Sequence, residues 1–214
     1  MVRMNHIFRP KTMDDIVGQP IKLLAETLSN PKPSCWLLVG DPGTGKTATT
    51  RVAANILGCE DDWSGLHHIP CTSLGIEEAK NLFNRDLRLS SCSGWHLVIL
   101  EECEWLSPQV QRFLKDALDL ETNMPAKTIV IGTSNKIDNL DEALVERFRV
   151  IQFKSNDEFR VSCMNKIEEK WRYVFEENLP SEAATWGRKG NRFSMRLAIQ
   201  QAEDALQAKL STVV

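Results

Sequence analysis

The sequence lacks the features that mark several classes of protein. No apolar run among its 214 residues reaches the length of about 20 residues that spans a bilayer. The first six residues are not followed by the apolar stretch of a signal peptide. Neither an internal repeat nor a low-complexity tract is visible. We therefore expect a protein that acts in the cytoplasm, including a viral protein in the host cytoplasm, without a membrane partner.

Zinc-binding patterns are also missing. The six cysteines form no C-x-x-C pair, and no histidine follows them at the spacing of a zinc site. His67 and His68 are adjacent, so their rings point apart on any regular element. Free thiols in a reducing compartment are the expected state. The formal charge of -3 does not by itself indicate a nucleic-acid binder, although a basic local surface is compatible with it.

What the sequence does contain is a glycine-rich loop between a predicted strand and a predicted helix. Residues 40–47 read GDPGTGKT and match the pattern G-x-x-x-x-G-K-[ST] in full. The glycines let backbone N–H groups turn onto phosphate oxygens, and the following helix adds the positive end of its dipole. Lys46 is expected on the β- and γ-phosphates, and the Thr47 hydroxyl on Mg²⁺. The predicted cofactors are thus ATP or ADP with Mg²⁺. The residues expected to bind the nucleotide through this loop are Asp41, Pro42, Gly43, Thr44, Gly45, Lys46, Thr47 and Ala48.

Two acids and an amide follow the ends of two further predicted strands. Glu101 and Glu102 come directly after an apolar run, where a magnesium carboxylate and a base for the attacking water belong. We assign Glu101 to the metal and Glu102 to water activation. Asn135 follows the next strand and is a candidate to orient the water or to sense the γ-phosphate.

The apolar runs predict an α/β fold with two domains. Continuous apolar strands are predicted at residues 35–39, 96–100 and 128–133, a fourth strand at 150–153, and helices at 46–57 and 108–120. Such runs, separated by helices, are typical of a parallel sheet that helices cover on both faces. After Lys154 only helices are predicted, at 157–178 and 193–210. We expect a nucleotide-binding α/β domain at 1–155 and a small all-α lid at 156–214.

These motifs, in this order, resemble the AAA+ ATPases of the clamp-loader clade, most closely the replication factor C small subunits and their phage equivalents. The resemblance covers nearly the whole chain. Besides the glycine-rich loop, it rests on residues 8–19 (an N-terminal box), 101–107 (an acidic box), 133–135 (sensor 1), 144–148 (an arginine-finger segment) and 193–199 (sensor 2).

The resemblance implies roles for individual residues and for partners. Val17 and Gly18 would contact adenine. Arg147 would enter the active site of a neighbouring subunit and stabilise charge on the transferring phosphoryl group. Arg196 would touch the γ-phosphate of its own subunit. The implied function is ATP hydrolysis in a homo- or hetero-oligomer of AAA+ subunits that acts on a sliding clamp and primer–template DNA.

The sequence departs from the clade at several positions. The acidic box opens with Glu101 rather than Asp, and Mg²⁺ is strict about geometry, so slow hydrolysis is expected. The finger segment reads Glu146-Arg147-Phe148 instead of Ser-Arg-Cys, as in other AAA+ branches that include branch-migration motors. Leu74 replaces a basic residue before a helix expected to face DNA. No helical collar domain follows the sensor 2 helix in these 214 residues, so the resemblance does not fix the number of subunits.

Two alternatives therefore stay open. One is an AAA+ adaptor, remodelling or branch-migration subunit that acts on other partners. The other is a subunit that binds ATP and hydrolyses it weakly. Lys80, Arg85 and Arg88 recur at roughly helical intervals and fit either a DNA-facing or a solvated helix face.

Overall fold

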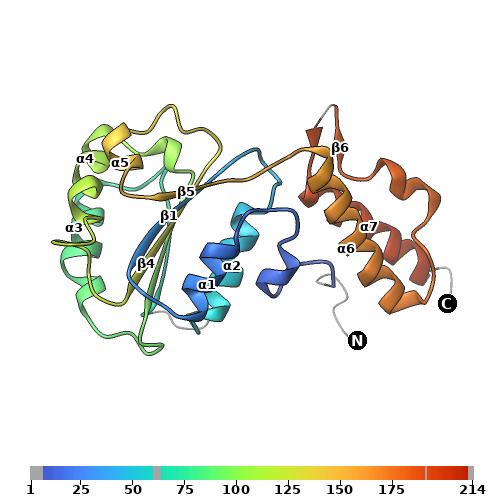
Figure 1. Cartoon of the computed structure of the whole chain (residues 1–214), viewed down its shortest axis with the longest axis horizontal. Coiled ribbons are helices and arrows are strands. Elements are labelled where there is room, and N and C mark those ends of the chain that lie inside the picture. Colours follow the sequence, from blue (N-terminus) through green and yellow to red (C-terminus); the bar gives the residue numbers. More distant parts are fainter. Residues whose placement is uncertain (1–6, 60–63, 191, 212–214) are drawn as a thin grey trace.

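A computed structural model describes residues 7–59, 64–190 and 192–211 of the chain. Its centre is a five-stranded, fully parallel sheet with the strand order β2-β3-β4-β1-β5 (Figure 1). The strands are β1 (Ser34–Val39), β2 (Leu66–Pro70), β3 (His96–Glu101), β4 (Thr128–Ser134) and β5 (Arg149–Gln152). The predicted parallel α/β fold is confirmed. The acidic strand β3 is not a direct neighbour of β1, because β4 lies between them.

Helices cover both faces of this sheet, α1 and α2 on one face and α3, α4 and α5 on the other (Figure 1). The α-helices are α1 (Lys22–Ser29), α2 (Lys46–Ile56), α3 (Ile76–Asn84), α4 (Pro108–Ala117) and α5 (Glu142–Val145). Short 3-10 turns connect them at η1 (Met13–Asp15), η2 (Asp86–Arg88) and η3 (Cys103–Trp105). No helix of the described residues is long and apolar enough to cross a membrane.

Alternating side chains of each central strand enter two separate cores. In β1, Leu37 packs with α3 and α4, whereas Trp36 and Leu38 pack with α1 and α2. Val98 of β3 faces the first core and Ile99 the second. Because both faces are buried, these strands are apolar throughout, which is why their sequences read as continuous hydrophobic runs.

Strand β2 was not predicted from the sequence. It lies at the edge of the described sheet, next to β3, and consists of Leu66-His67-His68-Ile69-Pro70. Its side chains are half-buried or exposed rather than fully buried. An edge strand needs no continuous apolar run, and it tolerates a terminal proline because one side has no partner strand.

The C-terminal part forms a helical lid around its own core. Its elements are α6 (Asp157–Phe175), η4 (Ser181–Thr185), β6 (Arg188–Lys189), β7 (Arg192–Phe193) and α7 (Met195–Ser211). The lid is helical as predicted, with one addition, because β6 and β7 pair as an antiparallel hairpin. Two-residue strands are too short to produce a recognisable sequence pattern. Helix α6 begins at Asp157, and the Asn156 side chain caps it by accepting a hydrogen bond from the Phe159 amide.

The N-terminal segment joins the sheet domain to the lid. Phe8 is buried in the lid core, where it stacks on Trp171. The Gln19 side chain donates to the carbonyls of Thr44 and Lys154 and accepts from the Lys154 amide at 2.8 Å. The side-chain amide of Gln19 thus links the N-terminal segment by hydrogen bonds to the glycine-rich loop and to the connection into α6.

Candidate nucleotide site

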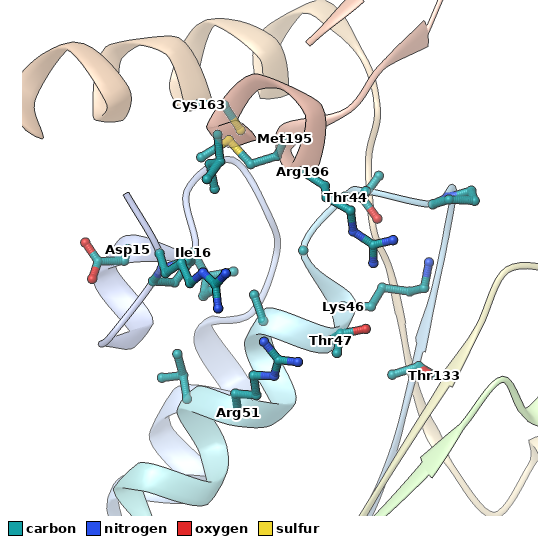
Figure 2. A pocket seen from close by; sticks show the side chains of 18 of the residues that line it. Asp15, Ile16, Thr44, Lys46, Thr47, Arg51, Thr133, Cys163, Met195 and Arg196 are labelled. Atoms are coloured by element: carbon teal, nitrogen blue, oxygen red, sulfur yellow. The ribbon is translucent and has the colours of Figure 1, made fainter. Parts of the chain in front are cut away.

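A cavity of about 1050 Å³ lies between the carboxyl edge of the sheet and the lid (Figure 2). Most of the residues predicted to bind or process a nucleotide lie around it. Those that line the cavity are Val17, Pro42, Gly43, Thr44, Gly45, Lys46, Thr47, Ala48, Glu102, Asn135 and Arg196. The predicted residues outside its lining are Gly18, Asp41, Glu101 and Arg147.

The glycine-rich loop has the backbone geometry of an anion cradle. Gly43 and Gly45 have φ values of +83° and +104°, in the left-handed region that disfavours side chains. Gly45 caps α2, and Lys46 is its first residue. The amino end of α2 therefore points its unpaired N–H groups toward the cavity, an arrangement that binds phosphate groups.

The Lys46 ammonium group is fully engaged by the protein. Its Nζ donates to the carbonyl of Gly40 at 2.6 Å, to the carbonyl of Asp41 at 3.0 Å and to Oδ1 of Asn135 at 3.0 Å. Burial lowers the pKa of Lys46 to about 8, and the charge of Arg196 acts in the same direction. An incoming phosphate would favour the ammonium form and replace at least one of these neutral partners.

Asn135 lies at the end of β4 and is held by a residue that the sequence analysis left without a role. Oε1 of Glu104 accepts hydrogen bonds from the Asn135 amide nitrogen at 3.1 Å and from Nδ2 at 2.8 Å. Ser134 Oγ lies 2.7 Å from Glu104 Oε2 and 2.6 Å from the Lys136 carbonyl. Glu104 follows the two acids of the acidic box, but nothing in the sequence indicates that it reaches the end of a different strand.

The two acids after β3 face different surroundings. Glu102 has a positive φ of 57°, its amide donates to Thr133 Oγ1, and it lines the cavity. The Glu101 carboxylate lies 3.0 Å from Nε2 of His68 on the edge strand β2. The assignment of Glu102 to water activation and of Glu101 to Mg²⁺ stays a prediction, and of the two acids Glu102 is the one among the residues around the cavity.

The donor groups fit a magnesium ion that is shared with phosphates. Thr47 lines the cavity, and Glu102 adds a carboxylate there. Within the described parts of the chain, no group of three or more His, Cys, Asp or Glu residues has the arrangement of a metal site. Mg²⁺ ordinarily takes only one or two protein ligands and completes its shell with phosphate oxygens and water, so this sparse set is sufficient.

The lid contacts the glycine-rich loop directly. The Met195 amide donates to the Gly43 carbonyl at 2.9 Å, and a Cβ at Gly43 would overlap Ser194 Oγ. Arg196, one residue further along α7, points into the cavity toward Lys46 (Figure 2). The glycine-rich loop and the start of α7 are therefore packed against each other, with no room for a side chain at Gly43.

Apolar side chains line part of the cavity beside charged ones. Ile16, Val17, Val52, Met195 and Ile199 line it, and the first three belong to the sheet domain. Arg51, which the sequence analysis did not single out, projects from α2 into the cavity (Figure 2). Apolar side chains of this kind can pack against a flat base.

Gly18 and Asp41 lie just outside the cavity. Gly18 packs against α6, since a Cβ there would meet the backbone and ring of Phe159 at 3.1 Å. The Asp41 carboxylate accepts from Ser155 Oγ at 2.7 Å and lies 3.5 Å from an Arg192 nitrogen. Asp41 contributes to the site through its carbonyl, which holds Lys46, and through its bonds to the connection and hairpin of the lid.

Arg147 lies away from the cavity of its own chain. It follows α5, its Nε donates to the Lys115 carbonyl at 3.1 Å, and Nη2 lies 3.5 Å from Asp119 Oδ2. Its side chain is 41% exposed. Both contacts lie on the outer surface around α4.

Comparison with known proteins places the chain in a family. Residues 36–156 match the model of the ATPase family associated with various cellular activities (AAA), and the chain belongs to this family. A replication factor C small subunit from Archaeoglobus fulgidus is 25% identical over 154 residues, which cover 69% of this chain and 47% of that protein. A DNA polymerase III subunit gamma from Buchnera aphidicola is 23% identical over 198 residues, 79% of this chain and 51% of the relative. The resemblance to the clamp-loader clade is confirmed, although the chain spans about half the length of these relatives.

A plant protein and a solved structure extend this comparison. Protein STICHEL-like 2 from Arabidopsis thaliana is 27% identical over 175 residues, 68% of this chain but 20% of that protein. The structure of the RuvB Holliday junction branch migration motor from Thermotoga maritima superimposes with a TM-score of 0.68 at 19% identity, covering 97% of this chain and 67% of the other. At this identity the structural match supports the fold, including the lid, and nothing more specific.

The lowered pKa of Lys46 predicts that nucleotide affinity depends on pH. We expect the ammonium form to bind phosphate, which would make the pKa in the complex higher than the value of about 8 in the free protein. Between these two values binding takes up a proton, and Kd for MgADP should rise by up to about tenfold per pH unit. Calorimetric titrations from about pH 7.5 to about pH 9.5 measure this dependence.

Lys46→Arg is the matched control, because its guanidinium stays charged throughout this range and its affinity should not change with pH. A wild-type Kd that stays constant across the same range would contradict the role of Lys46.

Proposed function

We propose that the chain is an ATP-binding and ATP-hydrolysing AAA+ subunit of a DNA-dependent, clamp-loader-type assembly. The observation that carries the proposal is the cavity itself, where the glycine-rich loop, Glu102, Asn135 and the lid residue Arg196 meet. Residues from the proposed α/β domain (1–155) and from the proposed lid (156–214) both line it.

Binding would use two sets of groups around the cavity. The N–H groups of the loop and Lys46 hold the phosphates, and the apolar side chains that include Val17 take the adenine. Thr47 is assigned to Mg²⁺; Glu101, the carboxylate assigned to the ion by motif position, lies outside the cavity lining, whereas Glu102 lies within it. When bound, the ion neutralises charge on the phosphates. Arg196 on α7 reaches the γ-phosphate of the same chain, so loss of that phosphate changes the contact between lid and loop.

Hydrolysis would use water as the nucleophile. Glu102 accepts a proton from the water while the water oxygen forms a bond to the γ-phosphorus. The bond between the γ-phosphorus and the bridging oxygen breaks, and that oxygen leaves with ADP. ADP and inorganic phosphate are the products. The pairing of Glu101 with His68 supports turnover that is slow relative to binding, because it engages the carboxylate assigned to the metal.

Arg147 would act in a neighbouring copy or a related subunit. Its exposed position and its distance from the cavity lining of its own chain support a role in trans. Its contacts to Lys115 and Asp119 are solvent-exposed, and replacing such contacts by contacts to another subunit costs little free energy. The site of one subunit is then complete only in an assembly.

The proposed partners are a sliding clamp and primer–template DNA. The names of two relatives, replication factor C and DNA polymerase III, support a role in DNA replication. Lys80 and Arg85 lie on or just after α3 and are exposed, pairing with Glu77 and Asp86. A lysine or arginine in a surface ion pair of this kind can leave its acidic partner and bind a DNA phosphate instead.

The proposed DNA dependence predicts that primer–template DNA stimulates ATP turnover. Steady-state phosphate release is measured for the full chain at about 50 to about 300 mM salt, with and without primed DNA and a clamp. Turnover should rise with DNA at low salt, and the stimulation should fall as salt increases. Glu102→Gln controls for contaminating ATPase and should abolish the signal.

Turnover that does not respond to DNA or clamp at any salt concentration would contradict the clamp-loader assignment. If turnover rises with a protein partner alone, the remodelling alternative is favoured. If ATP binds without measurable turnover, the chain is a binding subunit, and hydrolysis is not its function.

The proposed trans role of Arg147 predicts complementation between two inactive variants. Arg147→Ala binds ATP but lacks the finger, and Lys46→Ala carries the finger but binds ATP poorly. A 1:1 mixture should recover up to about a quarter to a half of wild-type turnover, because mixed neighbours join an intact site to an intact finger. Phosphate release measured over a range of protein concentrations detects this recovery.

Arg172→Ala, which removes another exposed arginine, on α6, is the control and should leave turnover unchanged. A mixture no more active than its two components would exclude the trans role. So would an Arg147→Ala variant that loses ATP affinity while its turnover per bound ATP is intact.

A further inference from the structure

Asn135 is fixed by partners of opposite hydrogen-bonding character on its two sides. On one side, Oε1 of Glu104 accepts from both Asn135 nitrogens, at 3.1 Å for the backbone amide and 2.8 Å for Nδ2. On the other side, Lys46 Nζ lies 3.0 Å from Asn135 Oδ1. The amide of Asn135 thus bridges a carboxylate and an ammonium group at the edge of the cavity.

These partners permit only one orientation of the amide. Oε1 of Glu104 acts as an acceptor toward the Asn135 backbone N–H, so the neighbouring side-chain atom must be the NH₂ group. An ammonium group can only donate, so the atom facing Lys46 must be the carbonyl oxygen. Rotating the amide by half a turn would break both contacts at once, and the assignment of its two atoms therefore follows from chemistry.

We propose that Glu104 is a positioning residue that locks Asn135 with its side-chain oxygen toward the phosphate end of the cavity. Asn135 then acts as a hydrogen-bond acceptor in the site and does not donate to the γ-phosphate. This inference rests on the proposed ATP hydrolysis. It adds a role for Glu104 and chooses between the two roles that the sequence left open for Asn135.

The orientation determines what Asn135 contacts when ATP is bound. Oxygens of a fully ionised γ-phosphate are acceptors and cannot pair with another acceptor. Three donors come into question for Oδ1: the Lys46 ammonium group, the Arg196 guanidinium and a water molecule. In the proposed complex Lys46 and Arg196 are assigned to the phosphates, which leaves the water. Asn135 therefore accepts a hydrogen bond from the attacking water and directs a lone pair of that water at the γ-phosphorus, while Glu102 takes the other proton.

The Glu104 contact also links the segment after β3 to the end of the neighbouring strand β4. Glu104 lies in η3, directly after β3, and its carboxylate reaches the end of β4. Glu102, two residues before Glu104, donates its amide to Thr133 of the same strand. Hydrogen bonds between the segment after β3 and the end of β4 thus fix Glu102, the proposed base, relative to Asn135, the proposed water ligand.

A direct test follows the Asn135 side-chain NH₂ group by nitrogen-15 NMR in the wild-type protein. The resonance is assigned as the one missing from Asn135→Asp. With ADP and with a non-hydrolysable ATP analogue, the two protons should stay hydrogen-bonded and exchange slowly with solvent. Glu104→Ala should abolish this protection. A resonance that leaves the Glu104 environment when the ATP analogue binds would show donation to the γ-phosphate and overturn the proposal.

Turnover gives a second, independent readout. Glu104→Ala should lower kcat by about tenfold or more, with Kd for ADP changed by no more than about threefold. Glu26→Ala, which removes an exposed glutamate of α1 outside the cavity lining, is the matched control and should keep the wild-type kcat. Wild-type kcat in Glu104→Ala would overturn the positioning role.

A charge-preserving swap separates an acceptor role from a donor role. Asn135→Asp places two carboxylates together and should be nearly inactive. Adding Glu104→Gln restores a donor–acceptor pair and still presents an oxygen to the cavity, so kcat should recover about tenfold over the single variant. No recovery would be expected if Asn135 had to donate, and would count against the proposal. If the wild-type protein does not hydrolyse ATP, the proposed function fails, and the NMR measurement still tests the Glu104 contact.

Discussion

The candidate site depends on one buried ammonium group held by three oxygens. Lys46 joins the end of β1, through the carbonyls of Gly40 and Asp41, to the end of β4, through Asn135. A cation in this position draws the loops of neighbouring strands together. It is also costly to bury, which is why its pKa falls to about 8. Phosphate would relieve that cost, so the arrangement of the loop favours an anionic ligand.

The lid is built onto this centre and shares its contacts. The Met195 amide binds the Gly43 carbonyl, Arg196 faces Lys46, and Gln19 fastens the connection to α6 onto the Thr44 carbonyl. A nucleotide in the cavity would therefore contact both domains at once. In the proposed function, this geometry would convert a change at the γ-phosphate into a difference in free energy between lid positions.

The sequence predicted those features that depend on local pattern. The glycine-rich loop and strands β1, β3 and β4 were recognisable because burial on two faces requires continuous apolar runs. Strand β2 was not, since an edge strand with two histidines and a proline has no such run. The partners of Glu104 and Glu101 could not be predicted either. They follow from the order of strands in the sheet, which brings Asn135 to Glu104 and His68 to Glu101. The predicted adenine contact of Gly18 and metal contact of Glu101 come from motif position alone, and both residues lie outside the cavity lining.

The central claim is that a nucleotide binds between the glycine-rich loop and the lid through Lys46. Calorimetric titration of the full chain with MgADP at neutral pH tests it most directly, with Lys46→Ala and the exposed Lys80→Ala compared side by side. Loss of the Lys46 charge should weaken binding by about 100-fold or more, whereas Lys80→Ala should match the wild type. If Lys46→Ala binds MgADP within about threefold of the wild-type affinity, which is less than one charge-assisted hydrogen bond is worth, the assignment of the site is wrong.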